Sequence, residues 1–281
     1  MLDRWSKAKR KDIVFTEYDL DIIRLVASRF DVREPWSYRF LTTPYFKALL
    51  GRGNYLENRL PKLTWHEGYL ELTEGQSKRF TGFQVRNIGK LGNYQFDADY
   101  SDTLPHSRTL PHSLFANLIA ASFEIGAKKN NLTIQPRSRQ ATEQIIPDWP
   151  IFSLLTPDHE RYIWIEADTG TEPMRRLTTQ GTSITDKLIH YRDALASREI
   201  THSMILFVTT TPGRAREILK TIRMVFDKHE SLAKHIAVKH VQFTPDLFKL
   251  PPATPWAVEE NWQRAHADLP FHFLKPEPWR T

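Results

Sequence analysis

The sequence predicts an α/β protein (α+β overall) with a basic, helical N-terminal domain and a larger domain in which helices cover a mixed central sheet. The chain has 281 residues, 40% of them hydrophobic, which is enough for one large or two ordinary globular domains. Residues 1–90 hold 17 Lys and Arg against 11 Asp and Glu, whereas residues 91–281 hold 22 of each. In the second half, amphipathic segments alternate with apolar, β-branched runs, which is typical of helices packed on a sheet.

Composition narrows the classes of protein. The chain has no cysteine, so disulfides and cysteine-ligated zinc sites are excluded. No apolar run approaches the roughly 18 residues of a membrane span, and no apolar segment follows the basic residues 1–11. We therefore expect a cytoplasmic protein without a signal peptide and without a membrane partner. The basic excess near the N-terminus favours an anionic partner, nucleic acid first, with ordinary solubility charge as the alternative.

The N-terminal domain is expected to span residues 16–96, behind a basic arm at residues 1–15. Thr16 is a typical helix N-cap, and Pro44 favours the start of a second helix because proline fits the first helical turn. The pattern predicts three helices and then two strands, over residues 17–29, 43–50, 54–63, 68–72 and 79–85. Three short helices followed by a two-stranded hairpin are the order of a winged helix.

In a winged helix, the third helix would read a DNA groove. The candidate DNA contacts are the polar and basic side chains of that helix and of the wing: Arg52, Asn54, Asn58, Arg59, Lys62, Lys78 and Arg79. The segment Arg59–Leu63, followed by Gly68-Tyr69-Leu70, resembles a passage that is usual in bacterial winged helices. Winged helices also dock proteins, so a protein-docking role stays open for this domain.

Residues 97–111 contain two prolines and little periodicity, and we expect them to connect the domains. The second domain is expected over residues 112–249. Its predicted order is helix, three strands, helix, strand, helix and strand, over residues 114–128, 132–135, 143–155, 161–167, 183–195, 203–209, 212–228 and 235–243. The C-terminal tail, residues 250–281, holds six of the 18 prolines and is expected to wrap the surface irregularly.

Acidic residues stand out on two neighbouring strands of this domain. Asp148 follows Pro147, and Glu166 and Asp168 close an apolar run that begins at Ile163. In a strand, Glu166 and Asp168 point to the same face. Two carboxylates on one face repel each other and are costly to bury, and a divalent cation would remove both problems. A solvated acidic strand end is the alternative.

An Asp at the start of one strand and a Glu near the end of the next, then a helix and a buried strand, resemble the PD-(D/E)xK nuclease core. Pro147-Asp148 matches its "PD", and Glu166-Ala167-Asp168 stands in the place of its "(D/E)xK". More narrowly, residues 16–225 resemble the replication-relaxation family of bacterial plasmids and mobile elements. In that family a winged helix precedes such a core, and a phrase like EADTGTE at Glu166 to Glu172, followed by Lys187 and Tyr191, recurs.

The resemblance implies a DNA-binding protein of a plasmid or mobile element that acts as a nickase or endonuclease in replication, relaxation or transfer. Phosphodiester hydrolysis calls for a metal, here Mg²⁺ or Mn²⁺. Asp148, Glu166 and Asp168 would be the ligands, and Lys187 and Tyr191 would complete the catalytic set. The alternative function is a non-catalytic DNA-binding regulator of replication or transcription. A homodimer and other replication or transfer proteins stay open as partners.

The chain departs from the nuclease pattern where a lysine is expected, because that position holds Asp168. One explanation is that Lys187 supplies the ammonium group from the neighbouring helix, where it lies one turn before Tyr191. The other is a degenerate site that binds metal or nucleic acid and cleaves nothing. Asp168 would then be a third ligand or would accept a salt bridge from Arg175 or Arg176.

Overall fold

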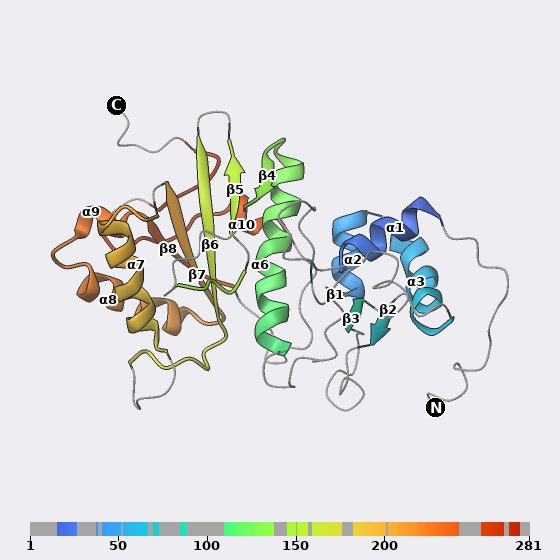
Figure 1. Cartoon of the computed structure of the whole chain (residues 1–281), viewed down its shortest axis with the longest axis horizontal. Helices are drawn as coiled ribbons and strands as arrows, with labels where there is room; N and C mark the ends of the chain where they lie inside the picture. The colour runs from blue at the N-terminus through green and yellow to red at the C-terminus, as the bar shows by residue number, and fades with distance from the viewer. Residues whose placement is uncertain are drawn as a thin grey trace. The chain divides into compact units, whose positions relative to one another are not determined.

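A computed structural model of the chain shows a mixed α/β protein (Figure 1). It describes residues 16–26, 38, 41–51, 53–66, 70–72, 85–88, 110–137, 145–149, 151–156, 159–175, 182–200, 202–241, 254–266 and 270–275. The chain divides into two compact units, Met1–Ala121 with Thr244–Ala253, and Ser122–Phe243 with Thr254–Thr281. The predicted basic arm lies outside the described residues. Among the described residues, no helix is both long and apolar enough to cross a membrane.

The described part of the N-terminal unit contains short helices: α1 (Glu17–Arg24), α2 (Thr43–Leu50) and α3 (Gly53–Pro61), which continues into a π-helical turn, η2 (Lys62–His66). Helix α1 is shorter than predicted, but it begins where predicted, with a capping box between Thr16 and Asp19. Helix α2 ends at Gly51, whose φ of 71° lies in the left-handed region that glycine tolerates best.

A small antiparallel sheet accompanies these helices. Its strands are β1 (Leu41–Thr42), β2 (Leu70–Leu72) and β3 (Val85–Ile88), in the order β1-β3-β2. The second predicted strand therefore starts at the residue where we expected it to end, and residues 79–84 lie outside the described part. Apolar side chains of the helices and of β2 form the core of this unit, with Phe46, Leu56, Leu60 and Leu70 fully buried.

The C-terminal unit is built on a mixed sheet, as predicted. In the described residues the sheet has five strands in the order β4-β5-β6-β7-β8. Their bounds are Thr133–Pro136, Phe152–Leu155, Glu160–Asp168, Ser203–Thr209 and Ile236–His240. The pairs β4–β5 and β5–β6 are antiparallel, and the pairs β6–β7 and β7–β8 are parallel. The parallel pairs need crossover connections, which helices supply.

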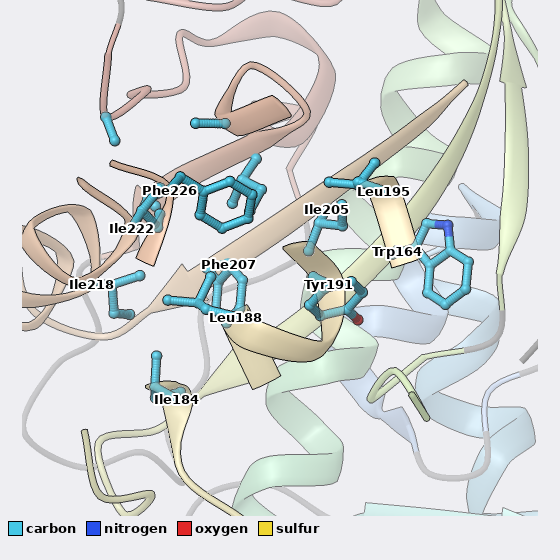
Figure 2. Close-up of a cluster of buried hydrophobic side chains, with 14 of the residues drawn as sticks. Trp164, Ile184, Leu188, Tyr191, Leu195, Ile205, Phe207, Ile218, Ile222 and Phe226 are labelled. Atoms are coloured by element: carbon cyan, nitrogen blue, oxygen red, sulfur yellow. The ribbon is translucent and has the colours of Figure 1, made fainter. Parts of the chain in front are cut away.

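Helices cover both faces of this sheet, and Figure 1 shows α6 on one side and α7, α8 and α9 on the other. The bounds of these helices are Leu110–Lys129, Ile184–Ala196, Pro212–Val225 and Glu230–Ala233. Trp164, Phe207 and Tyr191 belong to the buried cluster between the sheet and α7 and α8 (Figure 2). The Tyr191 ring lies edge-on to both other rings, at centroid distances of 5.9 Å and 6.4 Å. The face of β6 that carries Trp164 is thus turned toward α7.

Two predicted boundaries are corrected. Helix α6 begins at Leu110, inside the segment expected to be a linker, because Pro111 fits the first helical turn. Residues 97–109 of that segment lie outside the described part. Among the described residues of the strand predicted over 143–155, only Phe152–Leu155 is regular strand.

The C-terminal residues differ from the irregular surface tail that we expected. Helix α10 (Trp256–Glu259) is followed by Trp262, Phe271 and Phe273, and all of these aromatic side chains are at most 7% exposed. Phe123 of α6 contacts this group, stacking 6.4 Å from Trp262. The backbone N–H of Ala257 donates to the hydroxyl of Ser122 at 2.8 Å. The described residues of the tail therefore belong to the hydrophobic core of the C-terminal unit.

Candidate active site

Glu166 is the centre of the candidate site. It lies in β6 on the face turned toward α7 and is only 2% exposed. Tyr191 donates a hydrogen bond from its hydroxyl to Oε1 of Glu166 at 2.6 Å. Lys187 donates from Nζ to Oε2 at 2.9 Å. Lys187 and Tyr191 are one helical turn apart, so α7 presents both to the same strand.

Lys187 contacts carboxylates from three separate segments. Its Nζ lies 2.9 Å from Glu166, 3.1 Å from Oε2 of Glu172 and 4.0 Å from Oδ2 of Asp148. Glu166 comes from β6, Glu172 from the loop after β6, and Asp148 from the segment before β5. One ammonium group therefore faces three carboxylates in a largely buried position. The predicted convergence of Asp148, Glu166 and Lys187 is present in the structure.

Asp148 reaches this position without belonging to a regular strand. Its backbone N–H donates to the carbonyl of Ile165 at 3.0 Å, and its Oδ2 accepts from the N–H of Ala167 at 2.8 Å. These two bonds fix it against the second half of β6, on either side of Glu166. The sequence predicted the proximity of Asp148 and Glu166 through a strand pair, and the structure achieves it through these bonds.

Burial shapes the ionisation of the site. Burial, together with the charge of Asp148, raises the pKa of Glu166 to about 8, against the opposing effects of Lys187 and Tyr191. Burial alone would lower the pKa of Lys187, but Glu166, Asp148 and Glu172 outweigh it and raise that pKa. Burial and Glu166 also raise the pKa of Tyr191 well above its ordinary value. Near neutral pH, Lys187 and Tyr191 therefore keep their protons and act as hydrogen-bond donors.

Asp168 is two residues further along β6, on the same face, but it makes different contacts. Arg214 of α8 donates to it through Nε at 2.7 Å and through Nη2 at 3.4 Å. Thr209 and the backbone N–H of Gly170 donate to it as well. The two oxygens of Asp168 are thus engaged, and a cation already balances its charge. We therefore withdraw Asp168 from the predicted metal ligands and catalytic residues.

The described salt-bridge partner of Asp168 is Arg214, which the sequence did not indicate. We expected Arg175 or Arg176, which are close in sequence to Asp168. Arg175 is exposed, and Arg176 lies outside the described residues. Arg214 is 46 residues from Asp168, and only the parallel pairing of β6 with β7 brings the start of α8 to this strand end.

The carboxylates suit a hard cation by their chemistry. Carboxylate oxygens are the ligands that Mg²⁺ and Mn²⁺ prefer, and Asp148, Glu166 and Glu172 supply them from three segments. In this structure, the cation among them is the Lys187 ammonium. In the part of the chain that is described, no group of three or more His, Cys, Asp or Glu side chains has the arrangement of a formed metal site.

The predicted DNA contacts of the N-terminal unit fall into three groups. Asn54, Asn58 and Lys62 are exposed, and their spacing of four residues places them along one side of the α3–η2 segment. Arg59 is buried and pairs through its guanidinium with both carboxylate oxygens of Asp19, at 2.5 Å and 2.6 Å. The prediction that Arg59 contacts DNA is therefore wrong. The remaining candidates, Arg52, Lys78 and Arg79, lie outside the described residues.

Comparison of this chain with protein-family models, with curated proteins and with solved structures found no match.

Two residues of the site, Glu172 and Arg214, were missed. Glu172 ends the quoted phrase that begins at Glu166, so a sequence signal was present, but the phrase does not show that the loop returns to Lys187. Arg214 follows the N-cap Thr211 of α8, and its position gave no signal beyond its basic charge.

Proposed function

We propose that this protein binds DNA through its N-terminal unit and nicks or cuts it at the site around Glu166, with the help of Mg²⁺ or Mn²⁺. The observation that carries this proposal is the convergence of Asp148, Glu166 and Lys187. An acidic pair with a lysine is the set that the PD-(D/E)xK resemblance requires. The narrower resemblance, to the replication-relaxation family, supports a role in a plasmid or mobile element.

The order of elements around the site supports the nuclease-like interpretation. Helix α6 precedes strands β4, β5 and β6, and helix α7 leads into the buried, parallel strand β7. This is the predicted order. It lets one strand supply Glu166 and one helix supply both Lys187 and Tyr191, so the spacing of the reacting groups depends on rigid elements.

Each residue of the site has a role that its contacts support. Asp148 and Glu166 would hold the metal, together with Glu172. The metal would lower the pKa of an attacking water and balance the charge that develops on the phosphate. Lys187 keeps its proton, so it would stabilise anionic oxygens rather than act as a base. Tyr191 orients the carboxylate of Glu166 through a hydrogen bond of 2.6 Å.

The N-terminal unit supports the DNA-binding half of the proposal. The element order α1-β1-α2-α3-β2-β3 and the strand order β1-β3-β2 fit a winged helix. Its third helix would then be the groove-reading element, with Asn54, Asn58 and Lys62 exposed on it. The charge excess of residues 1–90 adds a non-specific attraction to phosphates.

A second candidate function, DNA-binding regulation without cleavage, is favoured by one observation. Both oxygens of Glu166 are engaged, by Lys187 and by Tyr191, and the side chain is almost fully buried. A metal could bind only if Lys187 moved away. In a regulator of replication or transcription, Lys187 would instead remain in place as the permanent counter-charge.

Incubating supercoiled plasmid with the protein and Mg²⁺ or Mn²⁺ separates the two candidates. The first predicts nicked or linear DNA, abolished in Glu166→Gln and unchanged in Glu160→Gln. Glu160 is a matched control because it lies in the same strand but pairs with Arg137 at the surface. If the wild-type protein retards DNA in a gel but leaves it supercoiled, the regulator is correct and the nuclease proposal fails.

A further inference from the structure

We propose that Arg214 is a positioning residue of this site, which holds the loop after β6 so that Glu172 reaches Lys187. The inference rests on the proposed function, because that function makes the site important. The contacts from which it is argued involve neither metal nor DNA. Arg214 contacts neither Lys187 nor Glu166 in the described structure. It would act only through Glu172.

Arg214 joins the end of β6 to the loop that follows it. Its guanidinium binds the carboxylate of Asp168 through two nitrogens, and Nη2 also donates to the backbone carbonyl of Glu172. A planar guanidinium can make both contacts at once because its donors diverge in a fixed fork. Both charged side chains are shielded from water, with 2% exposure for Asp168 and 13% for Arg214.

Hydrogen bonds at both ends also fix the conformation of the loop after β6. Gly170 has a φ of 84°, which a residue with a Cβ adopts only with strain, and its N–H donates to Oδ1 of Asp168 at 3.0 Å. Further along, the carbonyls of Pro173 and Met174 accept from the first residues of α7 at 3.1 Å. Arg214 therefore holds the backbone of Glu172 itself, and the N-terminus of α7 holds the two residues that follow.

This arrangement gives a physical role to the position where the nuclease pattern has a lysine. Lys187 already supplies the ammonium group from α7. Asp168 is then available to bind Arg214, and that pair anchors the loop that carries a further carboxylate, Glu172. Relative to the pattern, the lysine has moved from the strand to helix α7, as Lys187, and its place on the strand is taken by Asp168, which binds Arg214.

The competing explanation is that Arg214 only balances the charge of Asp168. Both explanations predict that removing Arg214 destabilises the protein, so stability alone does not separate them. They differ in whether the contact between Glu172 and Lys187 survives without Arg214. A coupling measurement between Glu172 and Lys187 answers this directly.

The experiment is a double-mutant cycle in urea, with EDTA present so that metal plays no part. Glu172→Gln, Lys187→Met and the double variant are compared in the wild-type and in the Arg214→Met background. We expect the coupling in the wild type to fall by at least half in Arg214→Met. Coupling of unchanged size would overturn the inference. Arg216→Met, an exposed arginine on the same helix, is the control that should preserve it.

If Arg214→Met fails to fold, Arg214→Lys takes its place. A lysine keeps the charge beside Asp168 but has no fork with which to reach the Glu172 carbonyl as well. We expect this variant to fold and to lose the coupling. Retention of the full coupling in Arg214→Lys would show that charge alone is sufficient, and the positioning role would be wrong.

A second readout is the binding of Mn²⁺, measured by calorimetry. Glu172→Gln should weaken it by at least about tenfold, because it removes one of the proposed ligands. In Arg214→Met the same substitution should change nothing further, whereas two independent losses would contradict the inference. If the wild-type protein binds no Mn²⁺, the proposed metal site fails, and the urea cycle still decides the role of Arg214.

Discussion

The two units of this protein each bury a carboxylate beside a basic side chain, and the two carboxylates respond in opposite ways. Burial alone would raise the pKa of Asp19, but the hydrogen bonds from Arg59 and Thr16 outweigh this effect and lower that pKa. Glu166 shares Lys187 with two other acids, and its burial together with the charge of Asp148 raises its pKa to about 8. The first pair is matched in charge and in hydrogen-bond geometry. The second has one cation for three carboxylates.

This difference separates a structural ion pair from a candidate site. A matched pair such as Asp19 and Arg59 satisfies its own groups and needs no further partner. A cluster with excess negative charge is costly to keep dry, and it gains from another cation or from protons. Asp168 and Arg214 resemble the first pair, which is why we assign them to positioning and assign Glu166 and Lys187 to chemistry.

The largest expected effect tests the matched pair. Arg59→Met should destabilise the N-terminal unit by about 3–5 kcal/mol, because it leaves the carboxylate of Asp19 buried and unbalanced. Amide exchange in α1 and α3, recorded over a range of urea concentrations, measures this loss of stability. Lys47→Met, which breaks an exposed pair with Glu57, should cost less than about 1 kcal/mol. Similar losses in the two variants would remove the distinction between buried and exposed pairs.

The mismatched cluster should be less sensitive to loss of its cation. Lys187→Met is expected to destabilise the C-terminal unit by about 2–3 kcal/mol at pH 8, and by less at pH 6. Glu166 can take up a proton when Lys187 is removed, whereas Asp19 with its lowered pKa resists protonation. Urea unfolding at the two pH values measures the loss. A loss that does not depend on pH would contradict the raised pKa of Glu166.

The wild-type protein should show the same contrast as a pH dependence. The folded pKa of Glu166 is about 8 and the ordinary value is 4.5, so the folded state binds the extra proton between these values. Stability from this group is full below about pH 4.5 and falls as pH rises to 8, by at most about 1.4 kcal/mol per pH unit. Glu166→Gln should remove this slope.

Asp19 should give the opposite sign in the same measurement. Its folded pKa lies below 3.8, so its contribution is present above that value and is lost as the pH falls further. Amide exchange in α1, followed between pH 5 and pH 3, reports it separately from Glu166. If both units lost stability in the same direction, the contrast between the two carboxylates would be wrong.

The sequence predicted the regular elements of the site well because their signals are local. The alternation of Ile163, Trp164, Ile165 and Glu166 indicated a strand with two distinct faces, and β6 has them. The spacing of Lys187 and Tyr191 placed both on one side of a capped helix. The continuous apolar run at residues 203–209 marked β7 with the observed bounds.

What the sequence did not predict depends on contacts between distant segments. The pairing of Asp168 with Arg214 follows from the parallel register of β6 and β7, and no local pattern encodes it. Arg59 looked like a DNA contact because basic charge on a groove-reading helix usually is one, and its partner Asp19 lies 40 residues away. The buried aromatic residues after Trp256 are widely spaced and lie among prolines, so they show neither a helical nor a strand periodicity.

A smaller effect probes the hydrogen bond that orients Glu166. Tyr191→Phe keeps the ring between Trp164 and Phe207 but removes the donor, so it should cost about 1–2 kcal/mol. In the nicking assay it should slow the reaction, because the carboxylate loses its orientation while Lys187 remains. Tyr55→Phe is the control, since Tyr55 is 42% exposed. Full activity in Tyr191→Phe would leave this tyrosine a purely structural residue.

The smallest effect on stability concerns the exposed counterpart of Arg59 in the same segment. Lys62 is exposed, so Lys62→Ala should change stability by less than about 0.5 kcal/mol. If Lys62 contacts a phosphate, the same substitution should weaken DNA binding for all sequences and lower the salt dependence of the affinity by about one ion. Binding titrations over a range of salt concentrations measure both quantities. Unchanged affinity and slope would mean that this side of α3 does not face DNA, even though Arg59 beneath it keeps the helix folded.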